Sequence, residues 1–305
     1  MALTYGEISS ITSQYFVPKL VDNIFNSNAL FQRWRKKNYE KLDGGTKIQV
    51  PLLYASTTAA GRYSGADTLD TTPNDQITAA EFDWKQYYAN ITITRLDELK
   101  NSGKSQIVNF VKAKVQAAEK TLANLLGTDL FGTGSTANSI YGLAAIAATS
   151  GTYGGIAKGS YSWWQGQADA ATTALTFAVI RGMIGDCSVD GDGPTVGVCT
   201  QNVYDNIMSL LQPQQRFTDS DTVKAGFKNI LWEGIPIVVD SHVAAGDLYF
   251  INENYIQLNV HKDEDFRFEP FVKPINQNIS TAKIYWTGAL TCSNCRMQGW
   301  FSAIA

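Results

Sequence analysis

The chain has 305 residues, with 25 Lys and Arg against 28 Asp and Glu, and a formal net charge of −3. This slightly acidic balance excludes a dedicated nucleic-acid binder, because such proteins normally carry a basic excess. Charged residues make up 17% of the chain, below the share of about a quarter that is typical of soluble domains. We therefore expect a surface rich in small polar residues that buries a large area against partner molecules.

The N-terminal sequence and the cysteines indicate the cellular compartment. MALTYGEISSITSQYF has no basic stretch followed by an apolar run, so we expect no secretory signal. No segment reaches the roughly 18 uninterrupted apolar residues of a membrane span. The four cysteines fit reduced thiols better than a disulfide scaffold. These features predict a soluble protein made inside a cell.

The first predicted elements are short helices, followed by a strand. Residues 1–42 show helical apolar spacing and no strong strand pattern, and we expect their basic run to lie on a solvated helix face (Arg33, Arg35, Lys36 and Lys37). Alternating apolar residues then predict a strand in GGTKIQVPLL, opened by a glycine turn.

A second alternating run, YANITITRLDE, predicts the partner of that strand. Between the two lie residues 54–83, which carry few large apolar side chains. A compact domain rarely holds about 30 such residues as an idle loop. We therefore expect a long hairpin that projects from the body and needs a partner surface to become ordered.

Residues 104–126 give the clearest helix. Apolar residues at spacings of three and four form one stripe, whereas charged residues lie off it. The stripe comprises Ile107, Val111, Val115, Ala118, Leu122 and Leu125, and the off-stripe residues are Lys112, Glu119 and Lys120. We expect Gly127 to cap the helix or the helix to extend through residues 128–131.

The remaining sequence predicts helices first and strands later. Residues 174–187 and 201–211 have helical spacing, with a strand at 194–200 between them, and extended patterns fill residues 230–304. This order indicates an α+β architecture and not a repeating βαβ one.

Cys292 and Cys295 are the strongest candidates for metal or redox chemistry. A zinc site would also need Cys187 and Cys199, but the two pairs have different spacings and only one resembles a zinc knuckle. In a regular strand, the sulfurs of Cys292 and Cys295 would point to opposite faces, because side chains alternate. We therefore expect neither metal nor redox function here, although an enzyme with a cysteine-based metal site remains an alternative.

No other motif supports catalysis. The chain has two histidines, His242 and His261, and no nucleophile elbow or zinc-protease motif. GTGSTA at 132–137 follows a helix instead of a strand, which favours a turn over a phosphate loop. DCSVDGDGP at 186–194 lacks the ligand spacing of a calcium loop. We expect no catalytic residues, no cofactor and no enzymatic activity.

Two stretches resemble the major capsid proteins of tailed bacteriophages. GIPIVVDSHVAAGDLYFINENYIQLNV (234–260) is similar to the signature of their axial, or A, domain. YWTGALTCSNCRMQGWFSAI (285–304) resembles the closing strand of their peripheral domain, with Asn294, Arg296 and Gly299 at the Asn-x-Arg-x-x-Gly positions.

The resemblance implies the Hong Kong 97-like capsid fold, with an extended hairpin called the E-loop and a long spine helix. The implied organisation is an N-terminal arm (1–42), the E-loop (43–100), the spine helix and peripheral domain (101–172), the A domain (173–270) and the return strands of the peripheral domain (271–305). Inter-subunit contacts are then expected at the E-loop residues Arg62, Tyr63, Asp67 and Asp70.

The function implied is a major capsid protein that assembles into hexamers and pentamers of an icosahedral shell around double-stranded DNA. The expected partners are a portal and a separate scaffolding protein, without sequence-specific DNA binding or membrane contact; binding of a decoration protein is left open. The location would be the virion capsid, assembled in the host cytoplasm. Residues 54–84 contain no lysine, so covalent cross-linking through a hairpin lysine is not expected. The alternative is an encapsulin-type cellular nanocompartment, which shares the fold but encloses cargo proteins.

Overall fold

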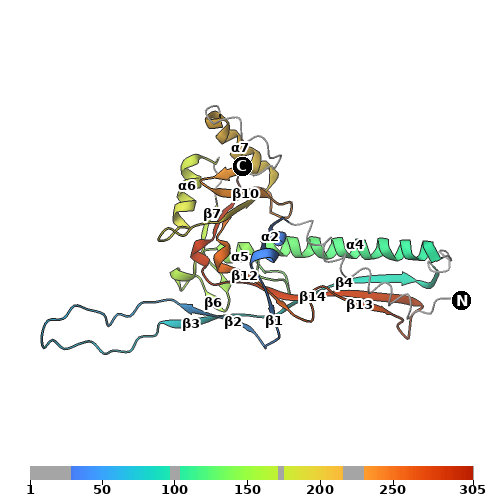
Figure 1. Cartoon of the computed structure of the whole chain (residues 1–305), viewed down its shortest axis with the longest axis horizontal. Coiled ribbons are helices and arrows are strands. Elements are labelled where there is room, and N and C mark those ends of the chain that lie inside the picture. Colours follow the sequence, from blue (N-terminus) through green and yellow to red (C-terminus); the bar gives the residue numbers. More distant parts are fainter. Residues whose placement is uncertain (1–28, 97–103, 171–174, 216–229, 305) are drawn as a thin grey trace.

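The computed structural model of the chain describes residues 29–96, 104–170, 175–215 and 230–304. They form an elongated molecule with two sheets, one long helix and a hairpin that projects far from the body (Figure 1). The predicted mixture of helices and strands is confirmed. Among the described residues, no helix is both long and apolar enough to cross a membrane.

The first sheet is built around one long strand, β14 (Ile279–Cys292). This strand pairs antiparallel with three others, and the shorter β1 (Tyr39–Leu42) adds to β12 in parallel. The three partners of β14 are β4 (Lys85–Thr94), β12 (Ile256–His261) and β13 (Arg267–Val272). The sequence of residues 1–42 gave no strand pattern, yet its last four residues form β1 because backbone pairing to β12 needs no apolar alternation.

The long helix α4 (Lys104–Phe131) packs beside β4 and runs along this sheet (Figure 1). At about 1.5 Å per residue, its 28 residues span about 42 Å. The predicted extension through residue 131 is confirmed, and Gly127 is not a cap. A Cβ atom at Gly127 would lie 2.6 Å from Cδ2 of His242, so glycine is needed inside the helix for close approach.

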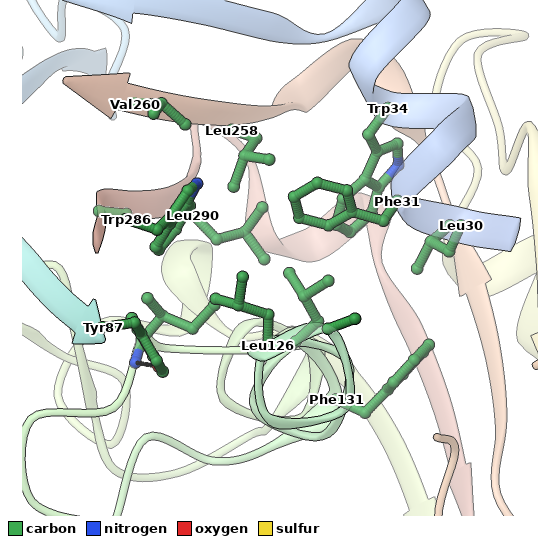
Figure 2. Packing of buried hydrophobic residues seen from close by; sticks show 14 of the residues in the cluster. Leu30, Phe31, Trp34, Tyr87, Leu126, Phe131, Leu258, Val260, Trp286 and Leu290 are labelled. Carbon is green, nitrogen blue, oxygen red and sulfur yellow. Dashed lines mark hydrogen bonds between the residues drawn. The ribbon is translucent and has the colours of Figure 1, made fainter. Parts of the chain in front are cut away.

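The predicted apolar stripe of α4 is partly wrong. Val115 and Leu122 are buried as expected, but Leu125 is 45% exposed and Leu126 is buried in its place. Glu119, expected off the stripe, is also buried. Figure 2 shows Leu126 facing the sheet residues Leu258, Trp286 and Leu290 across the core.

Leucine truncations on α4 test this packing directly. We expect Leu122→Ala, at a site with 1% exposure, to lower the free energy of unfolding by about 3 kcal/mol, because it leaves a cavity in a packed core. The same truncation at the half-exposed Leu125 should cost less than about 1 kcal/mol. Urea unfolding of both variants measures the difference, and equal costs would contradict the orientation of the helix.

The second sheet has the strand order β7-β15-β11-β8-β10-β9 and packs against α6 (Phe177–Asp186) and α7 (Gln201–Gln215). Its strands are β7 (Gln167–Ala170), β8 (Val196–Cys199), β9 (Ile230–Trp232), β10 (Ile235–Val239), β11 (Leu248–Ile251) and β15 (Gly299–Ser302). The predicted helices and strands of this region are confirmed, with α7 longer than expected. Thr176 caps α6, since its Oγ1 accepts a hydrogen bond from Val179 N at 3.3 Å.

The expected boundary between the A domain and the return strands lies between residues 270 and 271, but the two sheets do not divide there. Strands β12 and β13 precede that boundary but belong to the first sheet, because both pair with β14. Strand β15 follows it but belongs to the second sheet, between β7 and β11. The chain therefore crosses between the sheets twice after residue 251.

The extended hairpin consists of β2 (Ile48–Leu53), β3 (Ile77–Phe82) and residues 54–76 between them. The predicted hairpin is present, but its expected second strand is wrong. The first part of the run YANITITRLDE, YANITIT, instead belongs to β4 in the first sheet, which pairs with β14 over ten residues. The second strand of the hairpin is instead β3, with the sequence ITAAEF. Its two alanines make the strand pattern weak in the sequence.

Candidate functional site

The outer part of the extended hairpin is polar and exposed. Its two arms stay close to each other, because the side-chain amide of Asn74 lies 2.7 Å from Thr58 Oγ1. The described contacts within this part are local: Asp67 Oδ2 accepts a hydrogen bond from Ser64 N at 2.8 Å. A segment with this composition has little apolar area to bury against its own chain.

All four residues expected at an inter-subunit contact lie on this outer part. Arg62, Tyr63, Asp67 and Asp70 are exposed, and Tyr63 retains 68% of its accessible surface. Hydrogen bonds from the Thr72 hydroxyl and backbone lower the pKa of Asp70. The structure thus places all four side chains on the hairpin, exposed to solvent.

The base of the hairpin has one buried face and one exposed face. Ile48, Leu52 and Phe82 point into the core, whereas the cross-strand pair Leu53 and Ile77 is 77% and 73% exposed. An exposed pair of this size next to further apolar residues is typical of an interaction surface. The hairpin therefore offers both a polar tip and an apolar base.

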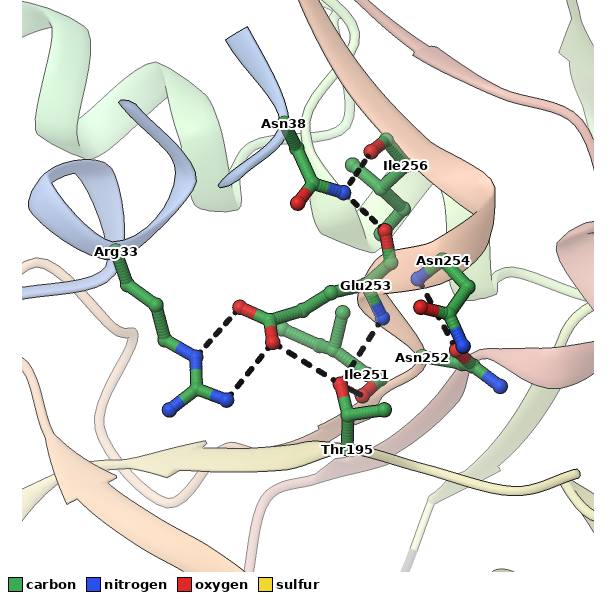
Figure 3. Close-up of polar contacts among 8 residues, drawn as sticks. All are labelled: Arg33, Asn38, Thr195, Ile251, Asn252, Glu253, Asn254 and Ile256. Atoms are coloured by element: carbon green, nitrogen blue, oxygen red, sulfur yellow. Dashed lines mark hydrogen bonds and ion pairs between the residues drawn. The ribbon is translucent and has the colours of Figure 1, made fainter. Parts of the chain in front are cut away.

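A partly buried ion pair joins α2 (Ala29–Lys37) to the junction of the two sheets (Figure 3). Arg33 Nε and Nη2 donate to Glu253 Oε1 and Oε2 at 2.6 and 2.8 Å. Glu253 is fully buried in a 3-10 turn (Glu253–Tyr255) between β11 and β12. Thr195 Oγ1 also donates to Glu253 Oε2 at 3.1 Å.

The same junction is held by Asn38, at the end of α2. Its side-chain amide donates to the carbonyl oxygens of Glu253 and Ile256, the latter at 2.6 Å (Figure 3). The expectation of a solvated helix face is therefore wrong for Arg33, whereas Lys36 and Lys37 are exposed as expected. The partner of Arg33 lies 220 residues away, so no local pattern could have revealed the pair. Since buried charges require partners, this contact fixes α2 to the junction.

The two cysteines of the Cys-x2-Cys pair lie in contact, which corrects the expectation that they point apart. Strand β14 ends at Cys292, and a 3-10 turn (Cys295–Met297) brings the thiol of Cys295 within hydrogen-bonding reach of Cys292. Both are fully buried, and burial raises the pKa of the Cys292 thiol well above its ordinary value. A thiol that stays protonated is a poor nucleophile and metal ligand.

Lys158 lies beside these thiols and is also fully buried. Its Nζ donates to the carbonyl oxygens of Ala145, Ile146 and Ala148 at 2.8, 2.5 and 2.9 Å. These oxygens belong to the C-terminal end of the short helix α5 (Leu143–Ala147). Burial lowers the pKa of Lys158. Lys158 therefore caps the C-terminal end of α5, and its contacts are structural.

Both histidines contact side chains of neighbouring elements. His242 Nδ1 lies 2.9 Å from Asp240 Oδ1, and its ring packs over Gly127 of α4. His261 makes an edge contact with Trp84. DCSVDGDGP forms a turn in which Val189 and Asp192 exchange backbone hydrogen bonds of 2.9 Å. Within the described ranges, no three His, Cys, Asp or Glu side chains are grouped to hold a metal ion.

We predict that a chelator leaves the fold intact. Cys292 and Cys295 act as small apolar side chains, so replacing both with alanine should lower stability by about 1–2 kcal/mol through lost packing. Melting curves with and without EDTA, together with the metal content of the purified protein, measure this. Stoichiometric zinc that is lost together with the fold would contradict it.

The sequence matches the family profile described as SU10 major capsid protein over residues 100–303. No curated protein sequence matches the chain. Solved structures with the same fold include capsid and encapsulin chains of low sequence identity.

The capsid asymmetric unit of cyanophage A-1(L) is 17% identical, with a TM-score of 0.62 over 90% of this chain and 92% of that one. The capsid of a native GTA particle is 11% identical, with a TM-score of 0.57 over 89% and 90%. The SrpI encapsulin of Synechococcus elongatus PCC 7942 is 10% identical, with a TM-score of 0.55 over 89% and 87%. At these identities the likeness shows a shared fold.

Proposed function

This chain belongs to the SU10 major capsid protein family, and we propose that it builds hexamers and pentamers of an icosahedral shell through its extended hairpin. It is the major capsid protein of a phage shell and a structural component of the virion. We propose that it has no catalytic activity, in keeping with the structural roles of its cysteines, histidines and Lys158.

The observation that carries the proposal is the exposed hairpin. Residues 54–76 extend from the body, bear polar side chains and make mainly local contacts. We propose that this hairpin corresponds to the E-loop of the family. We propose that it lies across a neighbouring subunit, with Arg62, Tyr63, Asp67 and Asp70 forming polar contacts there. Each contact would then repeat at every subunit of the shell.

The other parts take family roles in the same proposal. Helix α4 would be the spine helix, the first sheet would form the peripheral domain and the second sheet the A domain. Residues 1–42 would serve as the N-terminal arm, of which residues 1–28 lie outside the described ranges. The sheet pairings favour assigning β12 and β13 to the peripheral domain and β15 to the A domain.

The shell is proposed to enclose double-stranded DNA without reading its sequence, which the net charge of −3 supports. A portal, a separate scaffolding protein and a decoration protein are the proposed partners, with assembly in the host cytoplasm. One structural neighbour is an encapsulin, so a protein-filled compartment is the second candidate. The family match favours the phage shell.

Electron microscopy of particles from cells that express the chain alone tests assembly. We expect closed shells of uniform size, or such shells once a scaffolding protein is added. Particles from infected cells should contain nuclease-protected DNA. Particles filled with one host enzyme and no DNA would favour the compartment, and soluble monomers under all these conditions would contradict assembly.

A further inference from the structure

Strand β3 of the extended hairpin has one edge that pairs with β2 and one edge that is largely open. Backbone groups alternate in direction along a strand, and Glu81 N donates away from β2, to Gly154 O at 2.9 Å. The N–H and C=O groups of Ile77 and Ala79 therefore also face away from β2. Among the described residues, none of these four groups has a hydrogen-bond partner.

Ile77 and Ala79 both line a groove of about 620 Å³ at the base of the hairpin. The groove lies between β3 and the small hairpin of β5 (Thr152–Tyr153) and β6 (Ile156–Ala157). Aromatic rings form part of its wall, where Tyr54 and Trp163 stack with 5.3 Å between their centroids. An open strand edge beside an apolar wall is the arrangement that binds extended peptides as an added strand.

The opposite edge of the hairpin is closed to a further strand by a proline. Pro51 of β2 lies directly opposite Ala79 and is exposed. Since Ala79 faces away from β2, Pro51 faces away from β3, where it has no N–H to donate and its ring obstructs a neighbouring strand. Proline on an exposed edge is a common protection against strand pairing. Strand β3 contains no proline, so the hairpin can accept an added strand on the groove side.

The charge of the groove favours a basic occupant. Its described lining includes two carboxylates, Asp75 and Glu81, and neither lysine nor arginine. Glu81 is already paired with Lys47 at 2.8 Å. The carboxylate of Asp75, in contrast, has no hydrogen bond or ion pair with the described residues. A positive side chain on an occupant would therefore pair with Asp75.

Two segments of this chain that could be supplied by a second copy lack the required charge. Residues 54–76 carry one arginine against three aspartates. Residues 1–28 carry one lysine against Glu7 and Asp22. Neither segment has a basic excess, so neither complements an acidic groove. A separate protein is the better source of a basic strand.

We propose that the groove binds an extended, basic segment of a separate protein, which pairs with the open edge of β3 as an added strand. The backbone of this segment hydrogen-bonds to Ile77 and Ala79. Its apolar side chains contact Tyr54 and Trp163, and a lysine or arginine faces Asp75. The inference rests on the proposed shell function, because the segment holds an accessory protein on the shell. Peptide binding is measured on the unassembled subunit, so the two proposals can fail separately.

The probe is a short fluorescein-labelled peptide of alternating valine and lysine, and fluorescence anisotropy measures its binding to the subunit. Ala79→Pro removes an N–H that faces the groove and obstructs the added strand, so binding should weaken by at least about tenfold. Ala79→Val keeps the N–H and should bind as the unaltered chain does. Melting curves should show both variants folded. Equal affinities of the two variants, or no binding to the unaltered subunit, would overturn the proposal.

The charge of the occupant is tested with a second peptide, in which glutamate replaces lysine. It should bind at least about tenfold more weakly than the lysine peptide. Asp75→Asn should weaken binding of the lysine peptide by about threefold, and this variant keeps the whole backbone edge. Asp83→Asn is the matched control, because Asp83 is exposed and lies outside the groove. Equal binding of the two peptides would contradict a basic partner.

Amide hydrogen exchange locates the added strand and identifies its source. The lysine peptide should protect the amides of Ile77 and Ala79, and protection confined to another sheet edge would overturn the proposal. Shells assembled from this chain alone should leave both amides open to exchange. Protection in such shells would show that a second copy occupies the edge, which also overturns the proposal. Failure to form shells, with the peptide bound as described, would instead contradict the shell function.

Discussion

Replacing residues 57–74 with a short Gly-Ser linker should yield a folded chain that does not form closed shells. The contact between Asn74 and Thr58 shows that the two arms lie together, so a short linker can close the shortened hairpin. Strands β2 and β3, and with them the buried face of Ile48, Leu52 and Phe82, stay intact. The free energy of unfolding of the monomer should therefore change little.

The effect on assembly is large because each contact is repeated. A loss of about 1–2 kcal/mol per contact multiplies over the several neighbours of each subunit. Circular dichroism measures the helix content, and electron microscopy with native mass spectrometry measures the assembly state. The control is Gly61→Ala, where an added methyl group meets nothing within 4 Å and shells should form normally. Normal shells from the shortened chain, or its unfolding, would each contradict this role of the hairpin.

Arg33→Ala should lower the free energy of unfolding by about 3 kcal/mol, because it leaves the carboxylate of Glu253 buried without its cation. Thr195 alone would remain as a described hydrogen-bond donor to that carboxylate. The loss is the lower end of the range for buried pairs, since the Arg33 side chain is 38% exposed. Chemical unfolding of the unassembled subunit measures it.

The double variant Arg33→Ala/Glu253→Gln separates charge from packing. A neutral amide has a smaller desolvation cost, so the second substitution should recover part of the lost stability. Arg181→Ala is the matched control, because its pair with Glu233 at 2.9 Å is exposed on both sides and should contribute about 1 kcal/mol or less. Equal losses for Arg33→Ala and Arg181→Ala would mean that α2 is not held by the partly buried pair.

The elements that could be predicted from the sequence are those with local signals. The apolar spacing of α4 predicts the helix, and the polar composition of residues 54–83 predicts a projecting hairpin. The partner strand β3 could not be recognised because ITAAEF buries only Ala80 and Phe82, too few residues for a pattern. The end of α4 was ambiguous because Gly127 serves close packing with His242.

The contacts that the sequence could not predict join residues far apart in the chain or depend on a departure from regular strand geometry. Glu253 meets Arg33 across 220 residues. Cys292 and Cys295 meet because the strand ends between them, where a rule of strict alternation does not apply. The groove at the hairpin base joins residues 54 and 163, which only the folded chain brings together.

A cryo-electron microscopy map of the assembled shell tests the central claim most directly, because it locates the extended hairpin relative to its neighbours. We predict density for residues 57–74 on the surface of the adjacent subunit, with Arg62, Tyr63, Asp67 and Asp70 at that contact. A shell in which these residues lie only against their own subunit, or point into solvent with no neighbour beside them, would contradict the account.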